Sequence, residues 1–310
     1  MKLIILIIPF LCCTIIKEGV VSEKQKKEAL TKLQETLGSD LEWEKVHAAE
    51  FLLNLGYSGD VYKTFLKEEK QKGNEYYYRI GIWRVLVQSS LKSVEKQRWI
   101  NAIASVYISP NASDRLHAVE ALAKLRISPY TVSHSATDSI LNGVHNPMWV
   151  FTLWGTAFTS ESEKKQVRQK FIRIIGSSGE SVDVRKLAAY ALRHIKGVER
   201  EDQSMLLNTA INEPDTSAAY AFIISSALVN ISKDSLSTVK VQFCWKKLKE
   251  IASTPGKAGR YEALSVFGEL GGEEDLPLLT ALIEKSNRLN VMENTDIAIA
   301  SSNAILCIAR

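Results

Sequence analysis

The chain has 310 residues, of which 45% are hydrophobic and 24% charged, and its formal net charge is +4. This composition excludes an intrinsically disordered chain, because disordered chains carry too little apolar surface to form a core. The mild charge also argues against a dedicated nucleic-acid binder, which concentrates a much stronger basic field on one face. We therefore expect a folded chain with no nucleic-acid partner.

The chain starts with a short apolar segment that we set apart from the folded body. A charged start precedes a fourteen-residue apolar run, Leu3 to Ile16, which is typical of an export signal and short for a bilayer span. Two cleavage alternatives stay open. Cys12 or Cys13 resembles the lipidated cysteine of a bacterial lipoprotein box, and Val20-Val21-Ser22 offers an ordinary signal-cleavage site; an uncleaved anchor is the third alternative. All three predict an extracytoplasmic protein, in the periplasm or cell envelope, with residues 1–22 as the signal.

The body, residues 23–310, is predicted to be helical throughout. A lysine- and glutamate-rich helix from Ser22 to Leu37 ends at Gly38, which suits a helix C-cap, and we expect it to shield the first repeat. The other predicted helices span residues 43–55, 61–71, 76–90, 93–108, 114–125, 131–141, 148–158, 160–175, 183–197, 215–230, 233–252, 259–271, 276–285 and 294–310. The last of them has no predicted partner, so we expect an exposed apolar end there.

One eleven-residue helical phrase recurs five times, and each copy opens on a basic residue. The copies begin KVHAAEFLLNL at Lys45, RIGIWRVLV at Arg79, RLHAVEALAKL at Arg115, RKLAAYALRHI at Arg185 and RYEALSVFGEL at Arg260. The starts lie 34, 36, 70 and 75 residues apart, so each long gap has room for one weaker copy. Such a period is typical of a helical solenoid, in which each unit buries its apolar face only by stacking on its neighbours.

The phrase resembles the HEAT repeat family, in particular its short bacterial form Asp-x-Val-Arg-x-x-Ala-Ala-x-x-Leu-x-x-Leu-Gly. The match is closest at Asp183, Arg185, Ala188, Ala189, Leu192 and Gly197, and it is good over Lys45 to Gly56 and Asp114 to Leu125. The resemblance implies an all-α, armadillo-type fold: a right-handed α-α superhelix of about seven to eight helix pairs. It also implies that the second helix of each unit lines the concave face. It implies no reaction, since HEAT proteins are chiefly interaction scaffolds, although a few use the groove for catalysis.

Within the phrase, the constant positions have a structural explanation. Alanine and leucine three and four residues apart form one small, apolar helix face that neighbouring helices can approach. We call the basic residue that begins each copy its opener. An acidic residue precedes several of the openers, as at Asp114 and Asp183. We expect Arg115 and Arg185 to pair with the acid of an adjacent unit and to cap exposed helix ends, with direct contact to a partner as the alternative.

Two His/Glu doublets are the strongest candidates for chemistry. His47 and Glu50, and 70 residues later His117 and Glu120, have the i and i+3 spacing that places imidazole and carboxylate on one helix face. They could act as acid and base, line a polar ligand site, or simply hydrogen-bond between helices. The same two positions hold other residue types in the other copies. No third ligand is indicated by spacing, so we expect no metal.

Aromatic and arginine side chains are concentrated in the first half of the chain, and such residues supply most interface hot spots. Together with the two doublets, the candidate binding residues are Arg79, Trp83, Arg84, Arg115 and Trp149. Trp149 follows an Asn-Pro turn, which suggests exposure. The alternative is that these aromatic residues fill gaps between helices. Cys244 and Cys307 stand among apolar neighbours and are predicted to be buried, unpaired thiols, with a disulfide as the alternative.

The sequence therefore predicts a non-catalytic HEAT-repeat scaffold or adaptor, tethered to a membrane through a lipid anchor, that binds a protein or an extended ligand on its concave face. The alternative is an enzyme or small-ligand-binding protein that uses a His/Glu-lined groove in the first four repeats. No catalytic signature and no cofactor motif is recognised. A HEAT-type glycosylase acting on alkylated DNA is disfavoured by the export signal and the mild charge.

Overall fold

The computed structural model describes residues 21–232, 238–288 and 292–310. Over these ranges the chain forms α-helices, one short 3-10 helix at Glu273–Asp275 and no β-strand, which confirms the all-α prediction. None of the helices in these ranges combines the length and the apolar character that crossing a bilayer requires.

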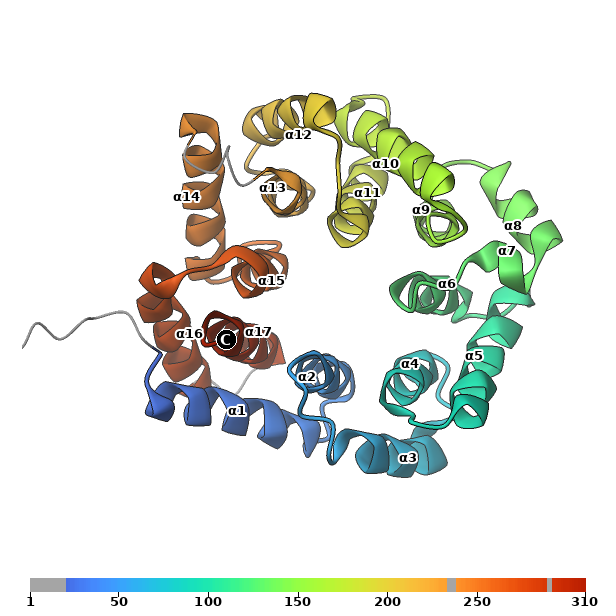
Figure 1. The fold of residues 1–310 in the computed structure, drawn as a ribbon, viewed down its shortest axis with the longest axis horizontal. Coiled ribbons are helices and arrows are strands. Elements are labelled where there is room, and N and C mark those ends of the chain that lie inside the picture. Colours follow the sequence, from blue (N-terminus) through green and yellow to red (C-terminus); the bar gives the residue numbers. More distant parts are fainter. Residues whose placement is uncertain (1–20, 233–237, 289–291) are drawn as a thin grey trace, which may run out of the picture.

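The helices alternate between an outer and an inner layer along the chain (Figure 1). The outer helices are α1 (Glu23–Leu37), α3 (Val61–Lys72), α5 (Ser93–Ile108), α7 (Pro129–Val132), α8 (His134–Leu141), α10 (Glu161–Gly176), α12 (Arg200–Asn212), α14 (Val239–Ser253) and α16 (Leu276–Arg288). The inner helices are α2 (Glu42–Asn54), α4 (Arg79–Ser89), α6 (Arg115–Lys124), α9 (Pro147–Thr156), α11 (Val182–Ile195), α13 (Tyr220–Asn230), α15 (Arg260–Leu270) and α17 (Met292–Ile308). All five copies of the phrase form inner helices. The expectation that the second helix of each unit lines the concave face is therefore wrong for this chain.

The predicted helix boundaries agree with the structure to within a few residues for most elements. The helix predicted over residues 131–141 is broken at Ser133, whose extended backbone separates α7 from α8 and whose hydroxyl caps α8. Helix α12 was not predicted, although Leu206, Leu207 and Ala210 form its buried face. The predicted start of the following outer helix at residue 233 lies outside the described residues.

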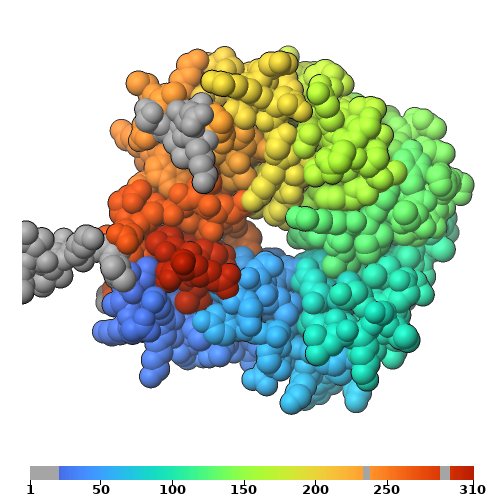
Figure 2. Space-filling view, in the orientation of Figure 1, coloured from blue at the N-terminus to red at the C-terminus, as the bar shows by residue number. Residues whose placement is uncertain are grey.

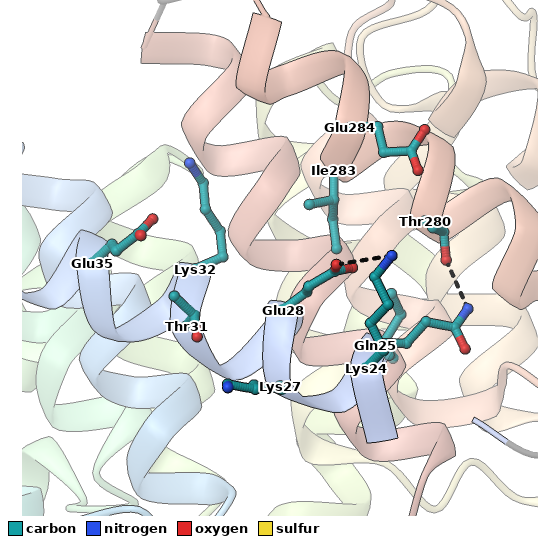
Figure 3. A pocket seen from close by; sticks show the side chains of 11 residues that line it. Lys24, Gln25, Lys27, Glu28, Thr31, Lys32, Glu35, Thr280, Ile283 and Glu284 are labelled. Carbon is teal, nitrogen blue, oxygen red and sulfur yellow. Dashed lines mark hydrogen bonds and ion pairs between the residues drawn. The ribbon is translucent and has the colours of Figure 1, made fainter. Parts of the chain in front are cut away.

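The first and last described helices, α1 and α17, meet and close the layers into a ring (Figure 1). Helix α17 packs on α15 and α16 and also on α1 and α2. Across this seam Gln25 Nε2 lies 3.2 Å from Thr280 Oγ1, and Arg310 Nη1 donates to the Asn54 carbonyl at 3.3 Å. Figure 3 shows the cavity of about 520 Å³ that remains at the seam, lined mainly by polar and charged side chains of α1 and α16. The expected exposed apolar end is therefore wrong: α1 covers the last inner helix as well as the first.

Small residues let the inner helices approach closely. Ala48, Ala49, Ala118, Ala188 and Ala189, all from the constant stripe of the phrase, are fully buried. At Gly81 of α4, an added Cβ would lie 3.0 Å from Val46 Cγ2 and 3.1 Å from the Trp43 ring, both of α2. Larger side chains at these positions would push neighbouring inner helices apart.

The basic openers hold the outer layer to the inner one. Arg115, Arg185 and Arg260 each donate from Nε to a carbonyl in the last turn of the preceding outer helix, over 2.7, 2.9 and 3.2 Å. Such carbonyls have no partner within their own helix. Arg79 instead forms a two-pronged pair with Asp114, the acid before the next opener, with Nε at 2.7 Å. The predicted capping role is therefore confirmed for Arg115 and Arg185. The predicted pairing with an acid is confirmed for Arg185, which contacts Glu213, whereas Arg115 has no such pair among the described residues.

Candidate functional site at the ring interior

The candidate site is the inner face of the ring, where the variable positions of the phrase lie. The third and sixth positions include His47, Glu50, Arg84, Glu120 and Tyr190, and these side chains interact with residues of other inner helices. Figure 2 shows a hollow near the middle of one face of the molecule, between the inner helices. The residues that the phrase leaves free are thus brought to a common interior.

The first three phrase helices contribute an ionic cluster to this interior. Arg84 is only 2% exposed, and its Nε and Nη2 lie 2.6 and 3.2 Å from the carboxylate of Glu50. On α6, Lys124 Nζ lies 2.9 Å from Glu120. Burial alone would raise the pKa of Glu50 and of Glu120, but Arg84 and Lys124 outweigh it and hold both pKa values below the ordinary range. Both carboxylates are therefore ionised at neutral pH.

The two histidines of the doublets have different surroundings. His47 Nδ1 lies 3.2 Å from Asp296 of α17, and its ring centre is 5.1 Å from that of Tyr261. His117 Nδ1 lies 3.9 Å from Glu120, and its ring packs against Trp43 at 5.4 Å. Only the second doublet therefore pairs internally. The structure places both doublets on the interior but does not join them into one catalytic group.

A second ionic cluster lies between α11 and α15 and was not predicted. Arg193 Nε lies 2.8 Å from Glu262, and the side chains are only 5% and 3% exposed. Glu269 approaches both Arg193 and Lys196. Burial raises the pKa of Glu262, and Arg193 opposes that rise. Helix α13 lies between α11 and α15 in sequence and packs against both, so this cluster spans the inner face of an intervening unit.

Aromatic rings complete the interior next to this cluster. The ring of Trp154 in α9 stacks on His194 at 5.4 Å and meets Tyr190 edge-on at 5.8 Å. Lys124 Nζ lies 5.7 Å from the centre of the Tyr190 ring, so α6 and α11 meet across α9. Burial, with the nearby charge of Arg193, lowers the pKa of His194 well below its ordinary value. His194 is thus a neutral packing residue at physiological pH.

The chemistry of this interior is charge pairing. Glu50, Glu120, Glu262 and Glu269 each lie within 3 Å of a cationic nitrogen. A general acid or base needs a pKa near the working pH, and the depressed pKa values of Glu50 and Glu120 do not provide one. The pKa of Glu262 is raised, but this carboxylate is buried against Arg193. Among the described residues, no group of three or more His, Cys, Asp or Glu side chains is placed to hold a metal ion.

The remaining predicted site residues have structural contacts. Arg79 and Arg115 are held by Asp114 and by the Tyr107 carbonyl, and Trp83 lies half-buried with its ring centre 5.3 Å from the Arg79 guanidinium. Trp149 is 1% exposed, which contradicts the expected exposure. Asn146 caps α9 and Pro147 begins it, so the turn leads directly into a buried helix in which Trp149 Nε1 donates to the Leu141 carbonyl.

The cysteine predictions have two outcomes. Cys244 and Cys307 are unpaired, as predicted; Cys244 is buried, and burial raises the pKa of its thiol to about 11. Cys307 is only partly buried, so the predicted burial is wrong for this residue. The proposed lipidation residues, Cys12 and Cys13, lie outside the described residues.

Sequence reasoning missed Arg193, Glu269 and Asp296 as interior residues. Glu262 and Tyr190 occupy the third and sixth positions of their copies, so the register could have identified them. Arg193 sits at the ninth position, which is apolar in the first three copies, and Asp296 belongs to the helix that closes the ring. Only the three-dimensional closure brings Asp296 next to His47.

Comparisons of this chain with protein-family models, with curated proteins and with solved structures find no match. What the protein does must therefore be inferred from its own residues.

Proposed function

We propose that this chain is a non-catalytic, HEAT-like scaffold or adaptor, a superhelix of stacked helix pairs, that binds a protein partner. The observation that carries the proposal is the pairing of the interior charges, above all Glu50 with Arg84 and Glu262 with Arg193. Charges that neutralise one another across neighbouring units fix the stacking of the repeats. They do not supply a free acid, base or nucleophile for a reaction.

The alternative of an enzyme or small-ligand site in the first four repeats is less well supported. A ligand that used Glu50 or Glu120 would have to displace Arg84 or Lys124. Separating such an ion pair leaves a charge that is mostly buried without its partner, which costs several kcal/mol. The interior would have to reorganise before it could bind anything polar.

The closed ring also limits how a partner could use the concave face. Side chains of inner helices that are not sequence neighbours already meet there, as Tyr261 does with His47 and Lys124 with Tyr190. An extended segment lying along the inner face would have to break these contacts. We therefore propose that the protein partner binds a surface other than the concave face.

We further propose that the body is exported and tethered to a membrane. The support is the sequence of residues 1–22, with its apolar run and the adjacent cysteines Cys12 and Cys13. Metabolic labelling with a palmitate analogue, followed by membrane fractionation, tests this part. Label that is lost when both cysteines are changed to serine supports a lipid anchor, and an unlabelled, membrane-free protein contradicts the tether.

The scaffold proposal is tested by changing residues of the interior and measuring whether the protein partner still binds. The double variant Glu50→Leu/Arg84→Met removes both members of a buried pair together, so no unpaired charge remains. We expect the full-length variant, affinity-purified from membranes in mild detergent, to retain the same co-purifying protein as the wild type. Loss of that protein from a variant whose helix content and melting temperature are unchanged would place binding in the interior and contradict the proposal.

A further inference from the structure

One rim of the ring carries the loops through which the chain enters the inner helices. The inner helices are parallel and in register, because Glu50 of α2 meets Arg84 of α4 and Arg310, after α17, meets the last residue of α2. Their N-terminal ends therefore share one rim, which we call the entry rim. Its described loops are residues 38–41, 73–78, 109–114, 142–146, 177–181, 213–219 and 254–259.

The entry rim exposes apolar side chains on four consecutive units. Within the loops these side chains are Tyr76 and Tyr77, which are 60% and 57% exposed, and Val144, which is 78% exposed. Ile108, the last residue of α5, and Val182, the first residue of α11, are exposed at the helix ends beside the loops. The loops around them are composed mainly of tyrosine, serine, glycine and asparagine, as in Gly-Asn-Glu-Tyr-Tyr-Tyr and Asn-Gly-Val-His-Asn. Antibody binding loops have this composition, because tyrosine gives large contact area at low entropic cost and the small polar residues adapt their hydrogen bonds.

The two tyrosines are held in place by the body of the protein. The guanidinium of Arg79 lies 4.5 Å from the centre of the Tyr76 ring, and Asp114 in turn holds that guanidinium in a two-pronged pair. The Tyr77 hydroxyl donates to Glu75 at 3.0 Å. Aromatic side chains that are positioned before binding lose little freedom when a partner arrives. This is the arrangement expected of interface anchors.

The loops of the entry rim carry more acidic than basic residues. The described loops contain six carboxylates, Asp40, Glu75, Asp114, Glu180, Glu213 and Asp215, and one lysine, Lys257. Arg79 and Arg185 neutralise Asp114 and Glu213. Of the four that remain, Asp40 and Asp215 are exposed, and Glu75 and Glu180 are half-buried. Glu180 lies 2.6 Å from His145 Nδ1, and Lys257 Nζ donates to the Asp215 carbonyl at 2.9 Å. An apolar row with acidic borders complements a surface with apolar side chains flanked by lysine and arginine.

The opposite rim is where the N-terminal helix begins. Glu23 and Lys26 at the start of α1 line a cavity together with Tyr57 and Arg310, which follow the C-terminal ends of α2 and α17. A body tethered through residues 1–22 would therefore present its entry rim away from the membrane.

We propose that the entry rim is the docking surface for the protein partner, and that this partner contributes apolar side chains flanked by basic residues. The inference rests on the proposed scaffold function and adds to it the place of contact and the chemistry of the partner. Tyr77 and Val144 are strongly exposed members of the apolar row on this rim and lie two units apart, so we take them as its probe positions.

Site-specific photo-cross-linking of the full chain in its own cells tests the surface. The photoreactive residue p-benzoylphenylalanine replaces Tyr77 or Val144 on the entry rim, and Tyr57 or Leu91 on the opposite rim as matched exposed controls. We expect one protein adduct of the same mass from both entry-rim positions. The yield of that adduct from the control positions should be much lower. Adducts to lipid at positions 77 and 144, or protein adducts from the opposite rim alone, would overturn the inference.

Charge reversal tests the chemistry of the partner. Glu75→Lys/Asp215→Lys should reduce the adduct yield at position 144 about tenfold or more, whereas Glu199→Lys/Glu273→Lys on the opposite rim should leave it unchanged. An equal adduct yield at position 144 in the two double variants would contradict a partner that binds through basic residues. Protein adducts at the opposite rim only would refute the entry rim and leave the scaffold function standing. The absence of protein adducts at all four positions, together with no specific co-purifying protein, would refute both.

Discussion

At Arg193 a guanidinium lies between the carboxylates of Glu262 and Glu269, and its side chain is 5% exposed. Replacing it by methionine keeps most of the volume but leaves Glu262, only 3% exposed, without its cation. Breaking a buried pair in this way costs about 3–5 kcal/mol. We therefore expect Arg193→Met to lower the free energy of unfolding by about that amount in urea denaturation.

The matched control is Lys186→Met, because Lys186 pairs with Asp183 at 2.8 Å on the surface, where the two side chains are 27% and 70% exposed. This change should cost less than about 1 kcal/mol. Equal losses in the two variants would show that the Arg193 cluster adds nothing beyond an ordinary surface pair.

Glu50 provides a pH prediction at the same scale. Its folded pKa lies below the ordinary value of 4.5, so the folded state binds fewer protons than the unfolded chain near that pH. The stabilisation from Glu50 is therefore present above about pH 4.5 and is lost as the pH falls through the folded pKa. Glu50→Gln should show a smaller loss of stability than the wild type between about pH 6 and about pH 3.5, measured by urea denaturation. Glu28→Gln serves as the control, because the Glu28 side chain is 54% exposed. This variant should lose as much stability between the two pH values as the wild type does. Identical losses in Glu50→Gln and the wild type would contradict the depressed pKa.

How far single residues could be predicted depends on what fixes them. The openers Arg115 and Arg185 followed from the repeat, because their partners lie within one unit along the chain. The exposure of Trp149 was mispredicted because Asn146-Pro147 is both a turn signal and a helix start, and only burial by neighbouring helices decides between them. Asp296 could not be placed beside His47 from the sequence, since 249 residues separate them.

Among the elements, α1 decides whether the stack is open or closed. The periodicity of the phrase predicted the helices and their alternation, because both depend on local apolar spacing. The periodicity did not predict the curvature of the stack, because curvature accumulates from small rotations between units and is not encoded in any one copy. The structure shows the consequence: α1 packs on α2 and on α17.

This dual packing predicts coupled effects at opposite ends of the chain. Leu33 of α1 is fully buried, so Leu33→Ala should cost about 2–5 kcal/mol through the cavity it leaves. Under native conditions, amide hydrogen exchange should become faster in α17 as well as in α2, and α9 should be unaffected. The exposed neighbour Gln34→Ala serves as the control. Faster exchange in α2 without any change in α17 would contradict the closed ring.

For the whole molecule, closure changes how the repeats should unfold. In an open array each unit contacts only its neighbours, so terminal units fray and separate transitions become possible. In this ring the first and last inner helices contact each other, so the described chain has no free terminal unit. Every unit is then stabilised on both sides, and loss of one exposes the faces of two others. Cooperative unfolding of the whole body follows from this arrangement.

Tryptophan positions make that expectation measurable. Trp43, Trp83, Trp99, Trp149 and Trp154 all lie in the first half of the chain, and Trp245 is the sixth. In a Trp245→Phe variant, fluorescence therefore reports unfolding of the first half, whereas far-ultraviolet circular dichroism reports the helices of the whole chain. We expect the two urea transitions to coincide in midpoint and slope, because neither half can lose its packing while the other keeps both of its neighbours. A helical signal that persists after the fluorescence transition is complete would mean that the halves unfold independently, and the seam between α1 and α17 would then contribute little to stability.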